Sequence, residues 1–249
     1  MERTLNVILT HQQPASVGRM LAWWAQCAPR EDVLLAFGGK EEDFRGIAHT
    51  QKFFVGDPRL RTKDHQRDLQ SYTAIFREAS AWMRGRDFSH VHFCEYDHVP
   101  LARDLNARQV ARLASEKADV IGSRLLRVDG TSHPHFLYHA ANAAFRGFWK
   151  KVTRRDDASV VLSMFATGSV WTREAFDAVA ATDEPFPMYL EIFLPTLAHH
   201  LGFRVRDLPD QAPFVSNLGD MAAKLDEARD AGAWAVHPVK WQWAGANEP

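Results

Sequence analysis

Two carboxylates at the end of a short apolar run have the chemistry to hold a metal ion. Residues 91–94 are followed by Glu95 and Asp97, which are two positions apart. Side chains alternate along a strand, so both acids would point to the same side if the strand continues through them. A hard divalent cation such as Mg²⁺ or Mn²⁺ would relieve their repulsion, because it prefers oxygen ligands. The alternative is a pair of solvated acids at a strand end, since short motifs also occur by chance.

Alternating strands and helices would position these acids. Apolar runs at 5–9, 32–37 and 52–55 predict buried strands, and residues 17–27 predict a helix between the first two. A long helix at 68–84 precedes the acid-bearing strand. This rhythm predicts an α/β fold with a mostly parallel central sheet flanked by helices.

The second half of the chain is less regular. Residues 128–157 lack a clear period and carry three histidines and a basic cluster, so this stretch is either an acceptor loop or lid, or an irregular packed insertion. On either side of it we expect helices at 107–114, 173–181, 188–201 and 218–231, and strands at 119–123, 160–165 and 203–208. No repeat or linker divides the chain, so one domain over residues 1–249 is the simplest reading.

Composition narrows the function classes. The chain has 249 residues, a net charge of -1 and 46% hydrophobic residues, which is typical of a globular protein and gives no basic field for nucleic acid. The apolar run at 5–9 is too short for a signal sequence or membrane span, so we expect no transmembrane segment and a cytoplasmic location. Cys27 and Cys94 lie in apolar segments and indicate buried thiols.

Polar residues follow several predicted strands, where ligands bind in open α/β sheets. Glycine permits close backbone approach, and polar side chains can contact a base or ribose. Lys63 could reach a phosphate or be an ordinary surface lysine. The candidates for binding a nucleotide are Thr10, His11, Gln12, Gly39, Asp57, Lys63 and Tyr96.

The order of these elements resembles the GT-A fold glycosyltransferases of the DxD type, including their family-2-like members. Their DxD motif appears here as Glu95-Tyr96-Asp97, with Glu in the first position. Glu is one methylene longer and could reach a metal directly or through water. The resemblance implies a nucleotide-diphosphate sugar donor, a divalent metal (Mn²⁺ or Mg²⁺), a donor half at 1–100 and an acceptor half at 101–249.

The same resemblance implies further site residues. His237 is similar in place to a late histidine that binds the metal, and Lys240 could neutralise phosphate charge. Glu191 resembles the acid that acts as catalytic base in inverting members, and its apolar context would raise its pKa. Residues Thr167, Gly168 and Ser169 resemble a loop that approaches the acceptor, which could be a glycan, a lipid-linked molecule or a small molecule.

Two other functions stay open at this point. A sugar-phosphate nucleotidyltransferase also needs an acid at a strand end and Mg²⁺, but residues 10–14 lack the glycine and basic residues of its phosphate loop. A non-catalytic nucleotide- or glycan-binding module would keep the fold without the chemistry. The sequence predicts neither the sugar, the stereochemical outcome nor the oligomeric state.

Overall fold

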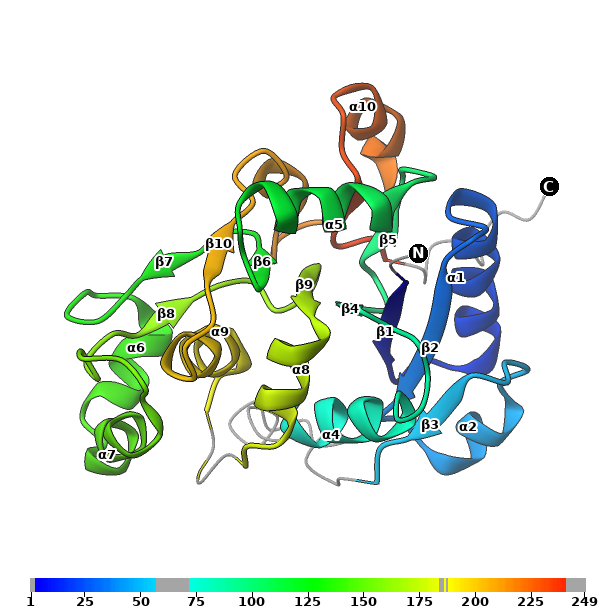
Figure 1. Ribbon diagram of the computed structural model, residues 1–249. Coiled ribbons are helices and arrows are strands. Elements are labelled where there is room, and N and C mark those ends of the chain that lie inside the picture. The colour runs from blue at the N-terminus through cyan, green and yellow to red at the C-terminus, as the bar shows by residue number, and fades with distance from the viewer. Residues whose placement is uncertain (1–2, 57–71, 184–185, 187, 241–249) are drawn as a thin grey trace.

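The structure, a computed structural model, describes residues 3–56, 72–183, 186 and 188–240. In this part of the chain a seven-stranded sheet has the order β10-β6-β9-β4-β1-β2-β3 (Figure 1). Neighbouring strands pair in parallel except β9, which is antiparallel to β4 and β6. The predicted α/β class with a mostly parallel sheet is therefore confirmed. The strands are β1 (Thr4–Thr10), β2 (Asp32–Phe37), β3 (Lys52–Phe54), β4 (His90–Glu95), β6 (Val120–Gly122), β9 (Ser169–Thr172) and β10 (Val205–Asp207).

Strand β1 lies inside the sheet and is buried along its whole length. Its side chains alternate between two cores, with Val7 on one face and Ile8 on the other. A strand covered on both faces has no solvent side, which is why residues 5–9 form a nearly continuous apolar run.

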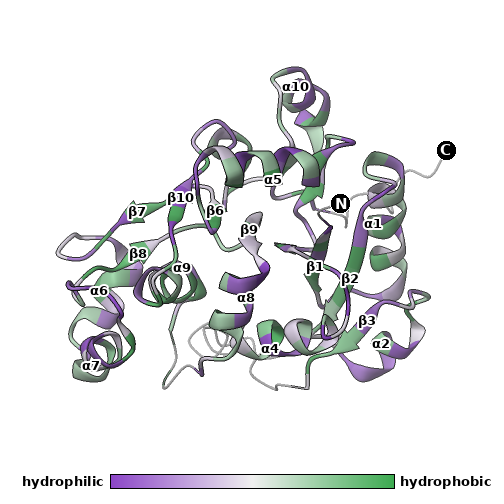
Figure 2. Ribbon diagram, viewed as in Figure 1, coloured by the Kyte–Doolittle hydropathy of each residue, from purple (hydrophilic) through white to green (hydrophobic). Residues whose placement is uncertain are grey.

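Helices cover both faces of the sheet. Helices α1 and α5 contribute to the core that contains Ile8, while α4, α8 and α9 pack on the face of Val7. Figure 2 shows hydrophobic and hydrophilic residues alternating along α1 and α5, as expected for helices with one buried side. The helices are α1 (Pro14–Cys27), α2 (Glu41–Gly46), α4 (Tyr72–Trp82), α5 (Leu105–Ser115), α6 (Pro134–Ala140), α7 (Ala143–Val152), α8 (Arg173–Ala180), α9 (Leu190–His200) and α10 (Leu225–Asp230).

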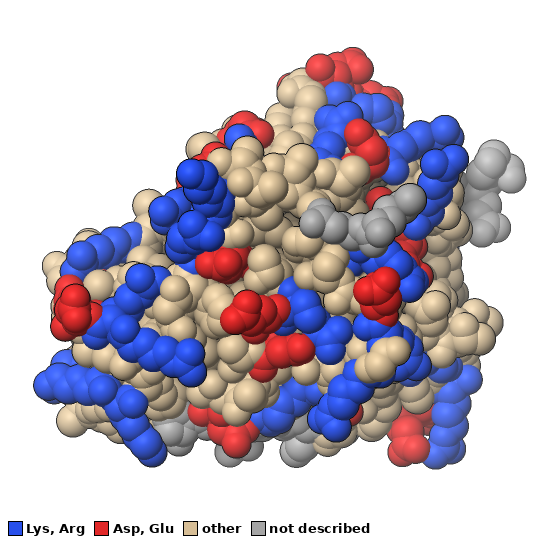
Figure 3. Space-filling view, viewed as in Figure 1, with Lys and Arg blue, Asp and Glu red and all other residues tan. Residues whose placement is uncertain are grey.

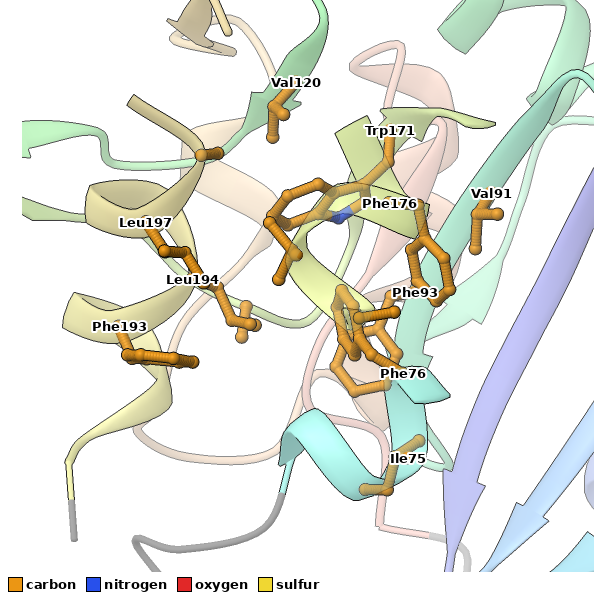
Figure 4. Packing of buried hydrophobic residues seen from close by; sticks show 14 of the residues in the cluster. Ile75, Phe76, Val91, Phe93, Val120, Trp171, Phe176, Phe193, Leu194 and Leu197 are labelled. Carbon is orange, nitrogen blue, oxygen red and sulfur yellow. The ribbon is translucent and has the colours of Figure 1, made fainter. Parts of the chain in front are cut away.

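Aromatic side chains fix the middle of the larger core (Figure 4). Phe76 of α4 stacks on Phe176 of α8 with ring centroids 4.3 Å apart, and it meets Trp171 of β9 edge-on at 5.5 Å. Phe93 of β4 lies 5.2 Å from Phe76. Each such buried ring stabilises the fold by about 1.5–3 kcal/mol, so this cluster anchors β4, whose end carries the acids.

Two short ladders complete the described fold. Strand β5 (Val99–Pro100) pairs antiparallel with β11 (Ala235–Val236), and β7 (Leu126–Arg127) pairs with β8 (Leu162–Ser163). The first ladder brings the end of the described chain beside the segment that follows β4. It therefore determines where His237 can lie.

Several predicted elements differ in the structure. The strand expected at 160–165 is only β8, because Thr196 of α9 takes both backbone groups of Leu162. The helix expected at 218–231 begins at Leu225, after a 3₁₀ turn at Ala222–Lys224. Residues 128–157 contain helices α6 and α7, which were not predicted. The start of the helix expected at 68–84 lies outside the described residues. No described helix is long and apolar enough to span a bilayer.

Candidate metal and substrate site

Glu95 and Asp97 come together through a turn. Strand β4 ends at Glu95, and the backbone nitrogen of His98 donates to the carbonyl of Glu95 at 3.0 Å, which closes a tight turn. The acids therefore do not meet by the strand alternation predicted from the sequence. One ligand atom from each of Glu95, Asp97 and His237 lies within 4.8 Å of the others. Ligands on opposite sides of one Mg²⁺ are about 4 Å apart, so these three side chains are close enough to share an ion.

The C-terminal segment holds His237 against this turn. Its backbone nitrogen donates to the carbonyl of Phe214 at 3.0 Å, and that of Val239 donates to the carbonyl of Asp97 at 2.8 Å. The peptide bond between His237 and Pro238 is cis. The contact with Phe214 thus holds His237 in place, and the contact from Val239 ties the same segment to Asp97.

Two buried polar atoms at this site lack hydrogen-bond partners. They are Oδ1 of Asp97 and Nδ1 of His237, which lie 3.4 Å apart in residues that are 4% and 7% exposed. Burial lowers the pKa of His237, the charge of Asp97 opposes that shift, and Lys240 adds to it. The imidazole is therefore neutral near pH 7 and has a lone pair to offer. A buried carboxylate oxygen and the nitrogen of a neutral imidazole, neither of which has a hydrogen-bond partner, fit a divalent cation.

Lys240 supplies a positive charge beside the acids. Its ammonium lies 3.4 Å from Oδ2 of Asp97, and its side chain is 47% exposed. The backbone nitrogen of Lys240 donates to Asp220 at 3.1 Å. This arrangement leaves the ammonium close to any anion that binds at the site.

The ends of β1, β2 and β4 form a polar rim next to the acids. The ring of His11 meets the ring of Tyr96 edge-on at 5.4 Å, and Nε2 of Gln12 lies 3.0 Å from a ring nitrogen of His11. A Cβ on Gly39 would approach the carbonyl oxygen of His11 to 2.9 Å, so only glycine fits there. Burial, and then Asp97 and Glu95, raise the pKa of Tyr96 to about 12, so its hydroxyl keeps its proton.

Thr10 lies beneath this rim. It is fully buried, and its hydroxyl accepts from the backbone nitrogen of Gln12 at 3.2 Å. Its carbonyl accepts from the backbone nitrogen of Gly38 at 2.9 Å. Thr10 therefore shapes the turn that presents His11 and Gln12. Asp57 and Lys63, the other two predicted donor residues, lie outside the described residues.

The loop at 167–169 supports the acid-bearing strand. The hydroxyl of Thr167 accepts from the backbone nitrogen of Glu95 at 3.0 Å. Gly168 has a φ of +78°, and a Cβ there would come within 2.5 Å of the ring of His98. The hydroxyl of Ser169 donates to the carbonyl of Ala166 and accepts from Trp171, and Ser169 is fully buried. The side chains of Thr167 and Ser169 are thus used within the fold, and that of Thr167 holds the backbone of Glu95.

Glu191 lies in the first turn of α9, in a separate cluster of aromatic residues. Its carboxylate lies 3.2 Å from Nδ1 of His135, and its side chain is 29% exposed. The ring of His135 stacks on Tyr189 with centroids 4.1 Å apart. Burial raises the pKa of Glu191 to about 7. A carboxyl group with that pKa can accept a proton from a substrate near neutral pH.

One short segment connects the two clusters. The backbone nitrogen of Met164 donates to the carbonyl of Glu191 at 2.9 Å, and Thr167 contacts Glu95. Residues 164–167 therefore touch both the candidate base and a candidate metal ligand.

Two histidines near these clusters were not predicted to have a role. His98 is 3% exposed and its ring lies 6.1 Å from that of His237, so it forms part of the floor beneath the acids. Its position directly after Asp97 in the chain was the available signal. In the sequence His135 is one of several histidines in a stretch without a clear period, and nothing there connects it with Glu191.

The chain matches no family model and no curated protein. It is similar in structure to the mannosyltransferase PcManGT from Pyrobaculum calidifontis, solved with GDP-Man and Mn²⁺, at 15% identity and a TM-score of 0.45. That match covers 84% of this chain and 55% of the mannosyltransferase chain, so this chain spans little more than half its length.

Two further solved structures are similar at the same level. A putative nucleotide-diphospho-sugar transferase from Desulfovibrio desulfuricans matches at 9% identity and a TM-score of 0.43, over 84% of this chain and 80% of the other. A197 from STIV matches at 11% identity and a TM-score of 0.40, over 83% and 82%. Nucleotide-sugar transferases, the class that the sequence resembles, are thus among its structural neighbours. At these TM-scores nothing about activity follows from them.

Proposed function

We propose that this protein is a glycosyltransferase that moves a sugar from a nucleotide-diphosphate sugar to an acceptor hydroxyl with the help of a divalent metal. The convergence of Glu95, Asp97 and His237 carries the proposal. Three potential ligands from two segments far apart in the chain lie close together, and two of their buried atoms have no hydrogen-bond partner.

Asp97 and His237 would hold the metal directly, and Glu95 directly or through water. The oxygen-rich donor set favours Mn²⁺ or Mg²⁺. The bound ion would supply Lewis-acid stabilisation of the charge that develops on a diphosphate leaving group. Lys240 would add a second positive charge for the phosphates, since its ammonium is half exposed beside Asp97.

The nucleoside would bind at the polar rim formed by His11, Gln12 and Tyr96. Ligands of open α/β sheets bind outside the carboxyl ends of the strands, and this rim follows β1 and β4. The side chains offer two rings and an amide for base and ribose contacts. Gly39 keeps the rim open, because any side chain there would meet the backbone of His11. Asp57 and Lys63 remain predicted donor contacts on sequence grounds.

Glu191 would accept the proton of the attacking hydroxyl if the reaction inverts. Its pKa of about 7 leaves a large fraction ionised at neutral pH and makes it a base of useful strength. The acceptor would lie between Glu191 and Gly168, along the segment that contacts both clusters. Thr167 and Ser169 would act by positioning that loop, since their hydroxyls are already engaged.

The test is to incubate the protein with Mn²⁺ and a panel of nucleotide sugars and to measure free nucleoside diphosphate. We expect release from at least one donor. Release of pyrophosphate from a nucleoside triphosphate and a sugar phosphate would instead identify a nucleotidyltransferase. Binding of a nucleotide sugar without turnover, with or without acceptors, would identify a binding module.

Asp97→Asn tests the site itself. It removes one ligand charge and keeps the shape of the side chain, so we expect turnover to fall by at least about a hundredfold while the melting temperature changes little. The matched control is Asp226→Asn, because that carboxylate is 92% exposed on α10. Undiminished metal-dependent turnover in Asp97→Asn would overturn the proposed site.

A further inference from the structure

A cavity lies away from the metal site, between α6, α7 and the loops at 129–130 and 158–161. Its volume is about 320 Å³. This is within the range of small-molecule sites, which begin at about 300 Å³. None of the residues proposed for metal, donor or acceptor binding lines it. Its apolar wall consists of Phe136, Ala140, Phe145, Trp149, Ala158 and Val161.

Two basic side chains line this cavity, one helical turn apart. Arg146 and Lys150 of α7 both line it, at positions i and i+4. One Arg146 nitrogen donates to the carbonyl of Ala140, which leaves its other donors available. Neither residue forms an ion pair with a carboxylate of the described residues. Figure 3 shows Lys and Arg side chains gathered at the corner of the molecule where Figure 1 places α7.

The acid at the cavity is already neutralised. Asp129 accepts from Nε and Nη2 of Arg127, both at 2.9 Å, and from the backbone nitrogen of Val161 at 3.0 Å. Ser159 is bonded to Asp157 through its hydroxyl at 2.5 Å. The charge that remains uncompensated at the cavity is therefore positive.

We propose that this cavity binds one molecule of a single-chain anionic amphiphile, with the alkyl chain against the apolar wall and the acidic headgroup on Arg146 and Lys150. A methylene is about the size of a water molecule, so the volume corresponds to a chain of roughly ten carbons. The ligand comes from solution as a free amphiphile. A bounded cavity whose positive charge lies on one helix has room for a single alkyl chain and its headgroup. The inference does not depend on the proposed glycosyltransferase activity.

The binding test is calorimetric titration with decyl phosphate below its micelle concentration. Decyl maltoside, with the same chain and a neutral headgroup, is the ligand control. We expect saturable one-to-one binding of decyl phosphate that is at least about tenfold tighter than that of the maltoside, as for a charge-assisted hydrogen-bonded pair. Absent binding, or equal affinity for both, would overturn the proposal.

Matched variants locate the site. Lys150→Glu should weaken decyl phosphate binding at least about tenfold, whereas Lys151→Glu, on the same helix but not at the cavity, should leave it within about twofold. Ala158→Trp fills the cavity from a loop and should abolish binding while the melting temperature is kept. Equal losses in both lysine variants would overturn the headgroup assignment.

A vesicle assay separates the free amphiphile from a membrane surface. Anionic phospholipid vesicles should compete poorly with decyl phosphate for the protein. Strong vesicle binding that Ala158→Trp leaves intact, together with no binding of decyl phosphate, would overturn the assignment to a single free chain.

Discussion

At the scale of single residues, Glu191 is the group whose environment changes its chemistry most usefully. Burial raises the pKa of its carboxyl to about 7, and the nearby His135 is itself held neutral by burial, so no full positive charge compensates it. The folded protein therefore binds a proton at Glu191 that the unfolded chain releases above about pH 4.5. Burying this carboxyl lowers the stability of the folded protein. Such a cost is expected where catalysis needs a base with a raised pKa.

We predict that Glu191→Gln stabilises the protein above pH 7 and leaves its stability unchanged near pH 4. A raised carboxyl pKa costs stability above the unfolded value, and the cost is complete above the folded value. From the shift to about 7, the gain at pH 8 is at most about 3 kcal/mol. Urea denaturation at pH 4 and pH 8 measures it. Glu174→Gln, on the exposed first turn of α8, is the control and should show no such difference.

The same substitution should reduce sugar transfer by about a hundredfold or more if Glu191 is the base. The wild-type rate should rise through a pKa near 7, and that rise should be absent from the residual rate of Glu191→Gln. If the variant keeps both the rate and the pH profile of the wild type, Glu191 is not the catalytic base. That result would not bear on the proposed metal site.

His237 gives a second residue-scale prediction that needs no activity. Its neutral imidazole contributes a nitrogen donor beside Asp97. We expect His237→Ala to weaken Mn²⁺ binding at least tenfold, measured by calorimetry. The control is His199→Ala on α9, which should bind Mn²⁺ as the wild type does. Equal affinities in the two variants would show that His237 is not a ligand.

At the scale of elements, the loop before β9 determines where Glu95 lies. Gly168 is left-handed and packs against His98, so a methyl group there suffers both the backbone strain and a collision. Gly130 has a similar φ of +74° but nothing within 4 Å of the position of a Cβ. Substitutions at Gly168 and Gly130 therefore separate the cost of backbone strain from the cost of the collision with His98.

We predict that Gly168→Ala destabilises the fold by more than Gly130→Ala, which should lose only about 1–2 kcal/mol for its φ. The difference is the cost of moving His98. Because Thr167 holds the backbone of Glu95, Gly168→Ala should also weaken Mn²⁺ binding, whereas Gly130→Ala should not. Denaturation midpoints and calorimetry on both variants check this. Equal effects of the two substitutions would contradict it.

Element by element, the sequence is informative where one local pattern decides the structure. The buried run at 32–37 and the helix capped by Thr172 are found where predicted, because strand burial and side-chain capping are both local. Strand β9 was missed because its burial comes from pairing with β4 and β6 on both sides. Helix α6 was missed because it is short and its aromatic and histidine residues match no simple amphipathic period. Helix α7 was missed although it is amphipathic, with Phe145 and Trp149 buried four residues apart.

The candidate site shows the same division. That Glu95 and Asp97 face one point was predicted, but the turn at His98 that brings them there was not. The approach of His237 followed only from family resemblance, since the ladder of β5 and β11 joins segments far apart in sequence. The contact between His135 and Glu191 is purely tertiary and had no sequence signal.

At the scale of the whole molecule, buried histidines connect the site to the stability of the fold. His92 and His98 lie under the acids with ring centroids 5.5 Å apart, and His139 lies under the Glu191 cluster. They are 0%, 3% and 2% exposed, respectively. Burial lowers the pKa of His92 to about 3 and that of His139 to about 4, and it holds the pKa of His98 well below its usual value.

These shifts predict a loss of stability in mild acid. Below pH 6.5 the unfolded chain protonates all three histidines while the folded protein does not, so each costs up to about 1.4 kcal/mol per pH unit. Glu191 acts in the opposite direction, because the folded protein binds its proton first. Burial also lowers the pKa of His135, His199, His200 and His237, so the losses outweigh the gain and the net fall between pH 6 and pH 5 is at least about 2 kcal/mol. Urea denaturation in the presence of a chelator at both values measures it.

Glu191 changes the stability in the opposite direction to the histidines, and this makes the prediction specific to the structure. Glu191→Gln removes this gain, so its stability should fall by about 1 kcal/mol more than that of the wild type over the same interval. General acid sensitivity of a folded protein would give both proteins the same slope. A wild type that is equally stable at pH 6 and pH 5 would mean that the histidines beneath the acids are hydrated, and the dry floor of the proposed metal site would then be lost with them.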